Sequence, residues 1–312
     1  MTVARMKPYL IGVNKEQKNE INMRADCDNC GYGKNKGCKG CVESKGCAPG
    51  GSGIIAYIIA AIIIPRNPEY LEEEIYMLKI EHLSKIYGDK KAVDDLSLHI
   101  KPGEIYGFIG HNGAGKTTTL KACCGILQYD RGEITVDGVS MKENPLLCKG
   151  KIAYIPDNPD LYEFMTGIGF LNFVADIFGV GETERKERIK NYADAFEITA
   201  DLNQPISAFS HGMKQKLAII SALIHEPKLI IMDEPFVGLD PKATHLLKEL
   251  MREMCEKGSA IFFSTHVLEV AEKLCDKVAI IKAGKLIRFG TMEEVKGDTT
   301  LEDVFLELEE EK

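Results

Sequence analysis

The sequence predicts an α/β protein in which a largely parallel sheet carries a helical insertion. Three observations favour this fold class. Apolar runs of strand length recur from Leu78 onward, and several are continuous rather than alternating, which is typical of strands buried on both faces. Segments with helical periodicity lie between these runs. The stretch from Pro156 to Pro227 contains no convincing strand, so we expect it to form a helical insertion.

Each expected element is supported by its own pattern. The strands are short runs rich in Val, Ile, Leu and Phe, and in chain order they are Leu78–Leu83, Ala92–Ile100, Glu104–Gly110, Lys151–Ile155, Leu229–Asp233, Ala260–Ser264, Lys277–Ile281 and Leu286–Phe289. The helices are longer segments whose apolar residues recur every three or four positions, and they include Lys116–Ile126, Thr183–Phe196, Lys214–Ile224 and Lys242–Glu256.

Composition excludes several classes of protein. The chain has 312 residues, of which 45% are hydrophobic and 28% charged, so intrinsic disorder over its whole length is excluded. Its formal net charge of -8 is opposite in sign to that of a basic nucleic-acid binder, and we expect no nucleic-acid partner. No apolar run approaches the ~20 residues that a helix needs to cross a bilayer. We therefore expect no integral membrane protein.

Residues 1–77 differ in composition from the rest and are expected to be a cysteine-rich leader and linker. Four of its cysteines form two Cys-x-x-Cys pairs that could hold one Zn²⁺ through four thiolates: Cys27, Cys30, Cys38 and Cys41. The alternative is a flexible leader with reduced thiols, and the odd cysteine Cys47 argues against a disulfide set. The apolar run Ile54–Ile64 is too short to cross a membrane.

A phosphate-binding loop follows the strand that ends near Ile109. The segment matches G-x-x-x-x-G-K-[ST] and opens a helix near Lys116, which is the context that this motif requires. Glycines let successive N–H groups point inward at an anion, and the helix N-terminus adds partial positive charge. We expect Lys116 to reach the β- and γ-phosphates and Thr117 to ligate Mg²⁺. The predicted nucleotide-binding residues here are Gly110, His111, Asn112, Gly113, Ala114, Gly115, Lys116, Thr117 and Thr118.

Two further strand ends carry polar residues. Asp233 and Glu234 close the run Leu229–Met232; Asp233 is the candidate to hold Mg²⁺ and Glu234 the candidate to polarise an attacking water. His266 follows the run ending at Ser264 and is a candidate to hydrogen-bond a γ-phosphate. In open α/β sheets ligands bind outside the carboxyl ends of the strands, so these groups should share one edge with the phosphate loop.

A second anion-binding helix start is expected after Phe209. Ser210 has the chemistry of an N-cap, and Gly212 permits close approach of the backbone to a ligand. A serine before a helix is usually only a cap, so this motif indicates anion binding only in combination with the phosphate loop and the acidic strand end.

Together these residues resemble the ATP-binding subunit of an ABC transporter from residue 78 to residue 312. The matching segments are Walker A (Gly110–Thr117), Walker B with its catalytic glutamate (Leu229–Glu234), the signature (Phe209–Met213), the D-loop (Val237–Asp240), the switch histidine (His266) and the aromatic residue that stacks on adenine (Tyr87). The resemblance implies a P-loop NTPase fold of the ABC type, with an antiparallel N-terminal β part and a helical subdomain at about residues 157–226.

The resemblance also implies partners and a cofactor. Two such subunits, here expected as a homodimer, meet head to tail, so that Ser210 and Gly212 serve the ATP held by the partner. Asp240 of the D-loop is a further expected nucleotide-binding residue. ATP binds with Mg²⁺, for which Thr117, Asp157 and Asp233 are the expected ligands. Hydrolysis by Glu234, with the switch histidine, drives a membrane permease, and the subunit lies peripherally at the cytoplasmic side of the cell membrane.

Two departures from the family pattern affect these expectations. Asp157 stands where the family usually has the Q-loop glutamine, and the signature reads Phe-Ser-His-Gly-Met instead of Leu-Ser-Gly-Gly-Gln. The variant signature and the ending Thr300–Phe305 are most similar to bacterial exporter subunits for drugs, peptides or lantibiotics, which pair with a separate permease. The alternatives are a soluble ABC-type ATPase not coupled to transport and a metal-binding regulatory module.

Overall fold

The computed structural model describes residues 75–310 of the chain, without the side chains of residues 309 and 310. Its centre is a six-stranded sheet in the order β10-β9-β3-β8-β7-β6. Neighbours from β6 to β9 pair in parallel, and only the edge strand β10 runs antiparallel. The strands are β3 Ile105–Ile109, β6 Ile152–Ile155, β7 Leu229–Asp233, β8 Ala260–Thr265, β9 Lys277–Lys282 and β10 Lys285–Thr291. The predicted parallel sheet is confirmed.

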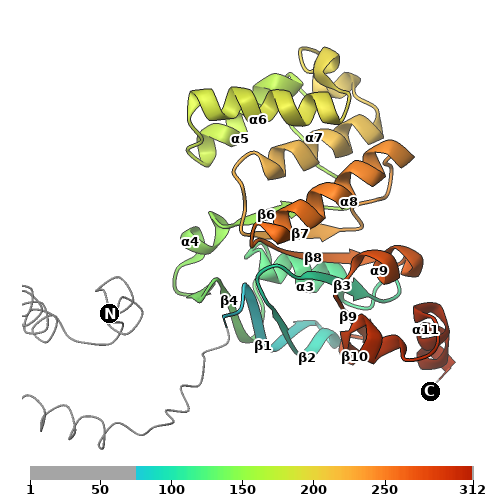
Figure 1. Ribbon diagram of the computed structural model, residues 1–312. Helices are drawn as coiled ribbons and strands as arrows, with labels where there is room; N and C mark the ends of the chain where they lie inside the picture. Colours follow the sequence, from blue (N-terminus) through green and yellow to red (C-terminus); the bar gives the residue numbers. More distant parts are fainter. Residues whose placement is uncertain (1–74, 311–312) are drawn as a thin grey trace, which may run out of the picture. The chain divides into compact units, whose positions relative to one another are not determined.

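The continuous apolar runs are explained by burial on both faces. Every residue of β3, β7 and β8 is buried. Because side chains alternate across a strand, Phe262 joins one hydrophobic cluster and its neighbour Phe263 joins the other. Figure 1 shows the helical layer on one side of this sheet and the antiparallel strands on the other.

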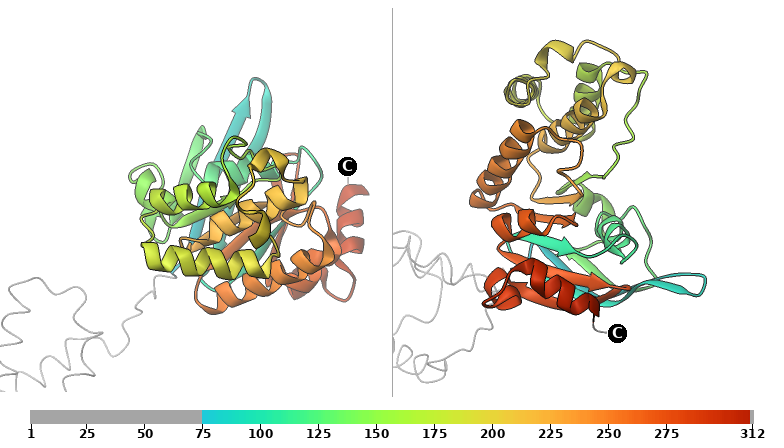
Figure 2. Two further views of the ribbon diagram at one scale, coloured as in Figure 1. Left: turned by 90° about the horizontal axis from the view of Figure 1, so that it is seen from above. Right: turned by 90° about the vertical axis from the view of Figure 1, so that its right-hand side faces the viewer.

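The second sheet is antiparallel, as the family resemblance implies, in the order β2-β1-β4-β5. Its strands are β1 Leu78–Tyr87, β2 Lys90–Ile100, β4 Arg131–Val136 and β5 Val139–Ser140. β1 extends beyond the predicted end at Leu83, and its far end forms with β2 a hairpin that projects from the body (Figure 2). β4 was not predicted from the sequence, because only Ile134 and Val136 in it are buried and its apolar pattern is too short to recognise.

The block between β6 and β7 is helical, as predicted. It contains α5 Gly167–Ile177, α6 Glu182–Ala195, the short helices η3 Thr199–Asp201 and η4 Ile206–Ala208, and α7 His211–Leu223. In this described stretch the only β pairing is an isolated bridge between Thr166 and Pro205. The predicted start of α7 at Lys214 was wrong, because Ser210 caps the helix by accepting the Met213 N–H at 3.3 Å.

The remaining helices cover the sheets and the end of the chain. They are α3 Lys116–Cys123, α4 Pro145–Lys149, α8 Pro241–Glu256, α9 Leu268–Leu274, α10 Met292–Lys296 and α11 Leu301–Glu310. The ring of Phe305 in α11 lies 4.9 Å from the ring of His111 in the phosphate loop. The last helix of the chain therefore touches the loop that follows β3.

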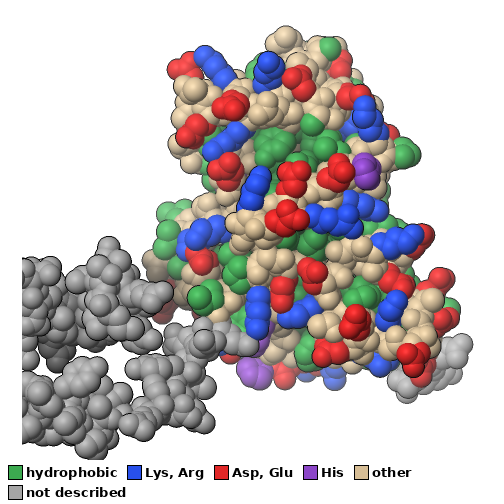
Figure 3. Space-filling view, viewed as in Figure 1, with side chains coloured by type: hydrophobic (Ala, Val, Ile, Leu, Met, Phe, Trp, Pro, Cys, Tyr) green, Lys and Arg blue, Asp and Glu red, His purple; other side chains and the backbone are tan. Residues whose placement is uncertain are grey.

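Membrane and surface properties of the described part are simple. None of the helices between residues 75 and 310 has the length and apolar character needed to span a bilayer. Figure 3 shows acidic and basic side chains interspersed over the visible face, without a field of one sign.

The predicted zinc ligands Cys27, Cys30, Cys38 and Cys41, and the apolar run Ile54–Ile64, lie outside the described residues, so the zinc site stays a prediction.

Candidate functional site

The phosphate loop connects β3 to α3 and is built around glycines that no larger residue could replace. A Cβ at Gly110 would lie 2.4 Å from the carbonyl oxygen of Ile281. Gly115 has φ +114°, and a Cβ there would lie 2.3 Å from the carbonyl oxygen of Ala92. Positive φ and close backbone approach both select glycine. The loop is therefore packed closely against β9 at Ile281 and against β2 at Ala92.

Lys116 is the first residue of α3. Its ammonium donates to the carbonyl oxygens of Gly110 at 2.5 Å and His111 at 3.3 Å, and lies 3.8 Å from Glu234 Oε1. Burial lowers the pKa of Lys116, while the neighbouring carboxylates of Glu234 and Asp233 oppose this shift. A buried ammonium is stabilised by anions placed around it. The lysine is therefore placed to donate hydrogen bonds to phosphate oxygens.

Asp233 closes β7 and is almost fully buried. The Ser264 hydroxyl, on the adjacent strand β8, donates to Asp233 Oδ1 at 2.5 Å. Parallel pairing sets this contact, because Asp233 and Ser264 are register partners. A buried carboxylate that keeps only some of its acceptor positions filled suits a cation nearby. Asp233 thus has both a fixed orientation and remaining coordination capacity.

Glu234 follows at the strand end in a left-handed conformation, with φ 49°. Its N–H donates to the Ser264 hydroxyl at 3.1 Å. Its Oε2 accepts from the backbone N–H of His266 at 3.3 Å and lies 2.9 Å from His266 Nδ1. Its Oε1 is buried and has no hydrogen-bond partner. One carboxylate oxygen is therefore anchored, and the other, beside the Lys116 ammonium, keeps unused capacity to accept a hydrogen bond.

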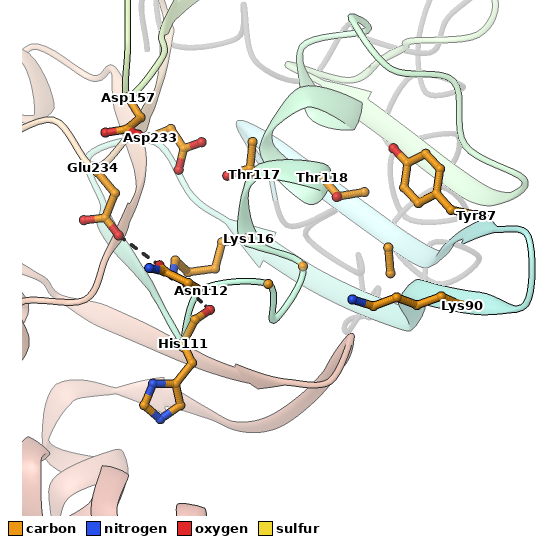
Figure 4. A pocket seen from close by; sticks show the side chains of 13 residues that line it. Tyr87, Lys90, His111, Asn112, Lys116, Thr117, Thr118, Asp157, Asp233 and Glu234 are labelled. Atoms are coloured by element: carbon orange, nitrogen blue, oxygen red, sulfur yellow. Dashed lines mark hydrogen bonds and ion pairs between the residues drawn. The ribbon is translucent and has the colours of Figure 1, made fainter.

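These groups surround one cavity of about 450 Å³, within the size range of small-molecule sites. Figure 4 shows Asp157, Asp233 and Glu234 at one end and Tyr87 at the other. The predicted residues that line the cavity are Tyr87, His111, Asn112, Gly113, Gly115, Lys116, Thr117, Thr118, Asp157, Asp233 and Glu234. Gly110 and Ala114 belong to the same loop without lining it, and His266 reaches the site through Glu234.

The predicted signature and D-loop residues lie elsewhere. Ser210, Gly212 and Asp240 are not among the residues that line the cavity. Gly212 packs so closely on the D-loop that a Cβ would lie 2.9 Å from the carbonyl oxygen of Gly238. Asp240 caps α8 and pairs with Lys216 at 2.7 Å, and this hydrogen bond lowers the pKa of Asp240. The chain therefore joins signature and D-loop to each other and not to its own phosphate loop.

The donor set in the cavity fits Mg²⁺ bound together with a substrate. Thr117, Asp157 and Asp233 offer one hydroxyl and two carboxylates. Across residues 75–310, no three acidic, histidine or cysteine side chains gather as a metal site. Magnesium is usually held by one or two carboxylates together with phosphate oxygens and water, so this small set is sufficient.

Three neighbours of the site were missed by the sequence analysis. Lys90 and Ala92 line the cavity from β2, and Ser264 contacts both acidic residues from β8. Lys90 could have been found, because Tyr87 and Lys90 flank a two-residue turn and must pair across the hairpin. Ser264 required the strand order, which no local pattern supplies.

Comparison with known proteins identifies the family. The family model described as ABC transporter matches residues 93–237. An uncharacterized ABC transporter ATP-binding protein of Methanocaldococcus jannaschii is 37% identical over 218 residues, which is 70% of this chain and 79% of that protein. This chain belongs to the ATP-binding proteins of ABC transporters. The resemblance of its motifs to this family, and the fold that it implied, are confirmed.

Two further comparisons agree with this assignment. The linearmycin resistance ATP-binding protein LnrL of Bacillus subtilis is 35% identical to this ATP-binding protein over 230 residues, covering 72% of this chain and 74% of that protein. A solved structure described as the ATP binding subunit of an ABC transporter is 36% identical, with a TM-score of 0.73, and covers 75% of this chain and all of that one.

Proposed function

We propose that this ATP-binding protein binds and hydrolyses Mg-ATP and powers export through a separate membrane permease. The observation that carries the proposal is the single cavity in which Lys116 and the acidic strand end meet. Export is favoured because a relative that is 35% identical over 230 residues is named a linearmycin resistance ATP-binding protein. We place the protein at the cytoplasmic side of the cell membrane, where a permease would hold it.

The roles of the binding residues follow from their positions in the cavity. Tyr87 offers an exposed aromatic face for the adenine base, and base–aromatic stacking contributes about 1–3 kcal/mol. The loop N–H groups and Lys116 bind the phosphates. Thr117, Asp157 and Asp233 would hold Mg²⁺, which supplies neutralisation of charge on the phosphate oxygens when it is bound.

Hydrolysis is assigned to Glu234. Its Oε1, which has no hydrogen-bond partner among the described residues, accepts a hydrogen bond from the attacking water and takes up its proton. The water oxygen bonds to the terminal phosphorus while the bond from that phosphorus to the ADP oxygen breaks. His266 orients this carboxylate through the 2.9 Å contact with Oε2. Because Oε2 is already engaged, Oε1 is the oxygen that acts on water.

A homodimer would complete each site. Ser210 is exposed at the start of α7, and Asp240 is exposed at the start of α8, so both face outward from this subunit. We propose that in a head-to-tail pair they lie over the partner's nucleotide. The helix start capped by Ser210 then supplies N–H groups and partial positive charge to the partner's terminal phosphate.

Three variants test the proposal. Lys116→Ala removes the ammonium and should abolish ATP binding, whereas Glu234→Gln should preserve binding and block turnover. Ser210→Ala should bind ATP but hydrolyse it poorly. Mixing Ser210→Ala with Lys116→Ala leaves one intact composite site in each heterodimer, so activity should reappear.

Ser221→Ala is the matched control, since this residue lies on the same helix and donates only to the carbonyl oxygen of Ala218. It should keep full activity. Normal turnover in Glu234→Gln would remove that residue from catalysis, and a mixture without recovered activity would contradict the head-to-tail pairing. Capture of the protein from detergent-solubilised membranes without any permease would favour the alternative of a soluble ABC-type ATPase.

A further inference from the structure

Lys90 stands beside the aromatic residue of the cavity for a geometric reason. Tyr87 and Lys90 are paired across the β1–β2 hairpin, whose turn consists of Gly88 and Asp89. Residues directly opposite each other in an antiparallel pair project from the same face of the sheet. Both side chains line the nucleotide cavity. The hairpin therefore presents an aromatic ring and an ammonium side by side.

The next residue shows that this orientation is specific. Side chains alternate along a strand, so Lys91 projects from the other face while Ala92 returns to the cavity. Lys91 pairs with Asp94 at 2.9 Å. The Lys90 ammonium makes no ion pair or hydrogen bond with any residue between 75 and 310. Of these adjacent lysines, one is neutralised within the protein and the other is directed at the site.

The position of Lys90 along the cavity selects its target. Figure 4 shows Lys90 on the same side as Tyr87, with its amine directed inward, into the space between Tyr87 and the acidic end. Lys116 lies at that acidic end, 3.8 Å from Glu234. A nucleotide with its base on Tyr87 and its last phosphate at Lys116 must pass its base-proximal phosphate between them. Among the described residues that line the cavity, Lys90 is the cation on that side, whereas Lys85, whose ammonium lies 5.2 Å from the centre of the Tyr87 ring, does not line it.

We propose that Lys90 binds the phosphate nearest the base, so that the hairpin contributes charge as well as stacking. This inference rests on the proposed function, because it needs a nucleotide in the cavity. The contact is common to ATP and ADP and absent from adenosine. It therefore raises the affinity for both nucleotides equally and adds nothing to the affinity for adenosine.

The test compares Lys90→Ala with Lys91→Ala, which removes the same charge from the opposite face. Binding of Mg-ATP and Mg-ADP is measured by calorimetry, and binding of adenosine by competition, at low and high salt. Lys90→Ala should weaken both nucleotides by a similar factor, roughly three- to tenfold, as expected for one partly exposed ion pair. Lys91→Ala should stay near the wild type, and Lys90→Arg should retain most of the affinity.

Salt dependence separates a charge contact from a structural effect. Affinity of the wild type should fall more steeply with salt than that of Lys90→Ala, because one screened ion pair is missing in the variant. If Lys90→Ala loses affinity for ATP alone, Lys90 acts at the terminal phosphate, and the inference is overturned. An equal loss for adenosine would mean that the hairpin is distorted, and would overturn it too. If the wild type binds neither nucleotide, the proposed function itself fails.

Discussion

The hydroxyl of Ser264 is the contact whose removal should disturb the acidic strand end most directly. It is fully buried, donates to Asp233 and accepts the N–H of Glu234. Ser264→Ala removes both contacts. The Glu234 N–H also points to the Ser264 carbonyl oxygen at 3.2 Å, which the substitution keeps. The main loss is therefore the hydrogen bond to the carboxylate of Asp233.

A hydrogen bond to a charged group contributes about 1.5–3 kcal/mol to the free energy of unfolding, and we expect Ser264→Ala to lower it by that amount. Urea denaturation at pH 7 measures this change. The ATPase rate should also fall, because Asp233 and Glu234 lose the group that fixes their relative position. Magnesium titration of the rate should show a higher half-saturating concentration in the variant.

Ser259→Ala is the matched control, because Ser259 directly precedes the other end of the same strand. Its hydroxyl donates at 3.0 Å to the neutral carbonyl oxygen of Pro227, so its loss should cost about 0.5–1.5 kcal/mol and leave the magnesium dependence unchanged. If the variant at Ser264 is as stable as the variant at Ser259, with the same magnesium dependence, the role given to the Ser264 hydroxyl is refuted.

Three further outcomes follow from the contacts. Gly115→Ala should reduce ATP affinity at least tenfold, because a Cβ would strike a β2 carbonyl, whereas Gly113→Ala, whose Cβ meets open space, should lose less; calorimetry compares them. Burial lowers the pKa of His225 to about 4, so the unfolded chain alone takes up a proton as pH falls from 6.5. Urea unfolding should then show about 2 kcal/mol less stability at pH 5 than at pH 7, a difference absent in His225→Phe. Phe305→Ala removes the ring that packs on His111, so it should lower the free energy of unfolding by about 1–2 kcal/mol and the ATP affinity a few-fold. Unchanged ATP affinity would mean that α11 does not support nucleotide binding by the phosphate loop.

The parts of the fold that could be predicted are those in which burial and local chemistry agree. The run Leu229–Asp233 is buried at every position, so its apolar character is continuous and ends at a carboxylate. The phosphate loop needs glycine where φ is positive, and that requirement is visible as a motif. Such features are determined by a few neighbouring residues and need no knowledge of the strand order.

The parts that could not be predicted depend on contacts between distant segments. The site role of Ser264 comes from parallel pairing with Asp233, 31 positions away. The contact between His111 and Phe305 joins the loop after β3 to the last helix. The start of α7 was placed too late because its first turn, from His211, carries too few apolar side chains to show helical periodicity.

The separation of the two anion-binding features within one chain has a structural cause. Lys116 and Glu234 follow β3 and β7, which both pair with β8, so their spacing is fixed by backbone hydrogen bonds. Ser210 caps the start of α7, the last helix of the helical block, and in the described residues no ladder joins it to the sheet. Because no strand pairing holds this helix start to the sheet, we expect it to shift more easily relative to the sheet than the paired groups shift relative to one another. If a partner supplies Ser210, nucleotide binding would favour one position of the helical block relative to the sheet. Such a shift between positions is what coupling to a second protein requires.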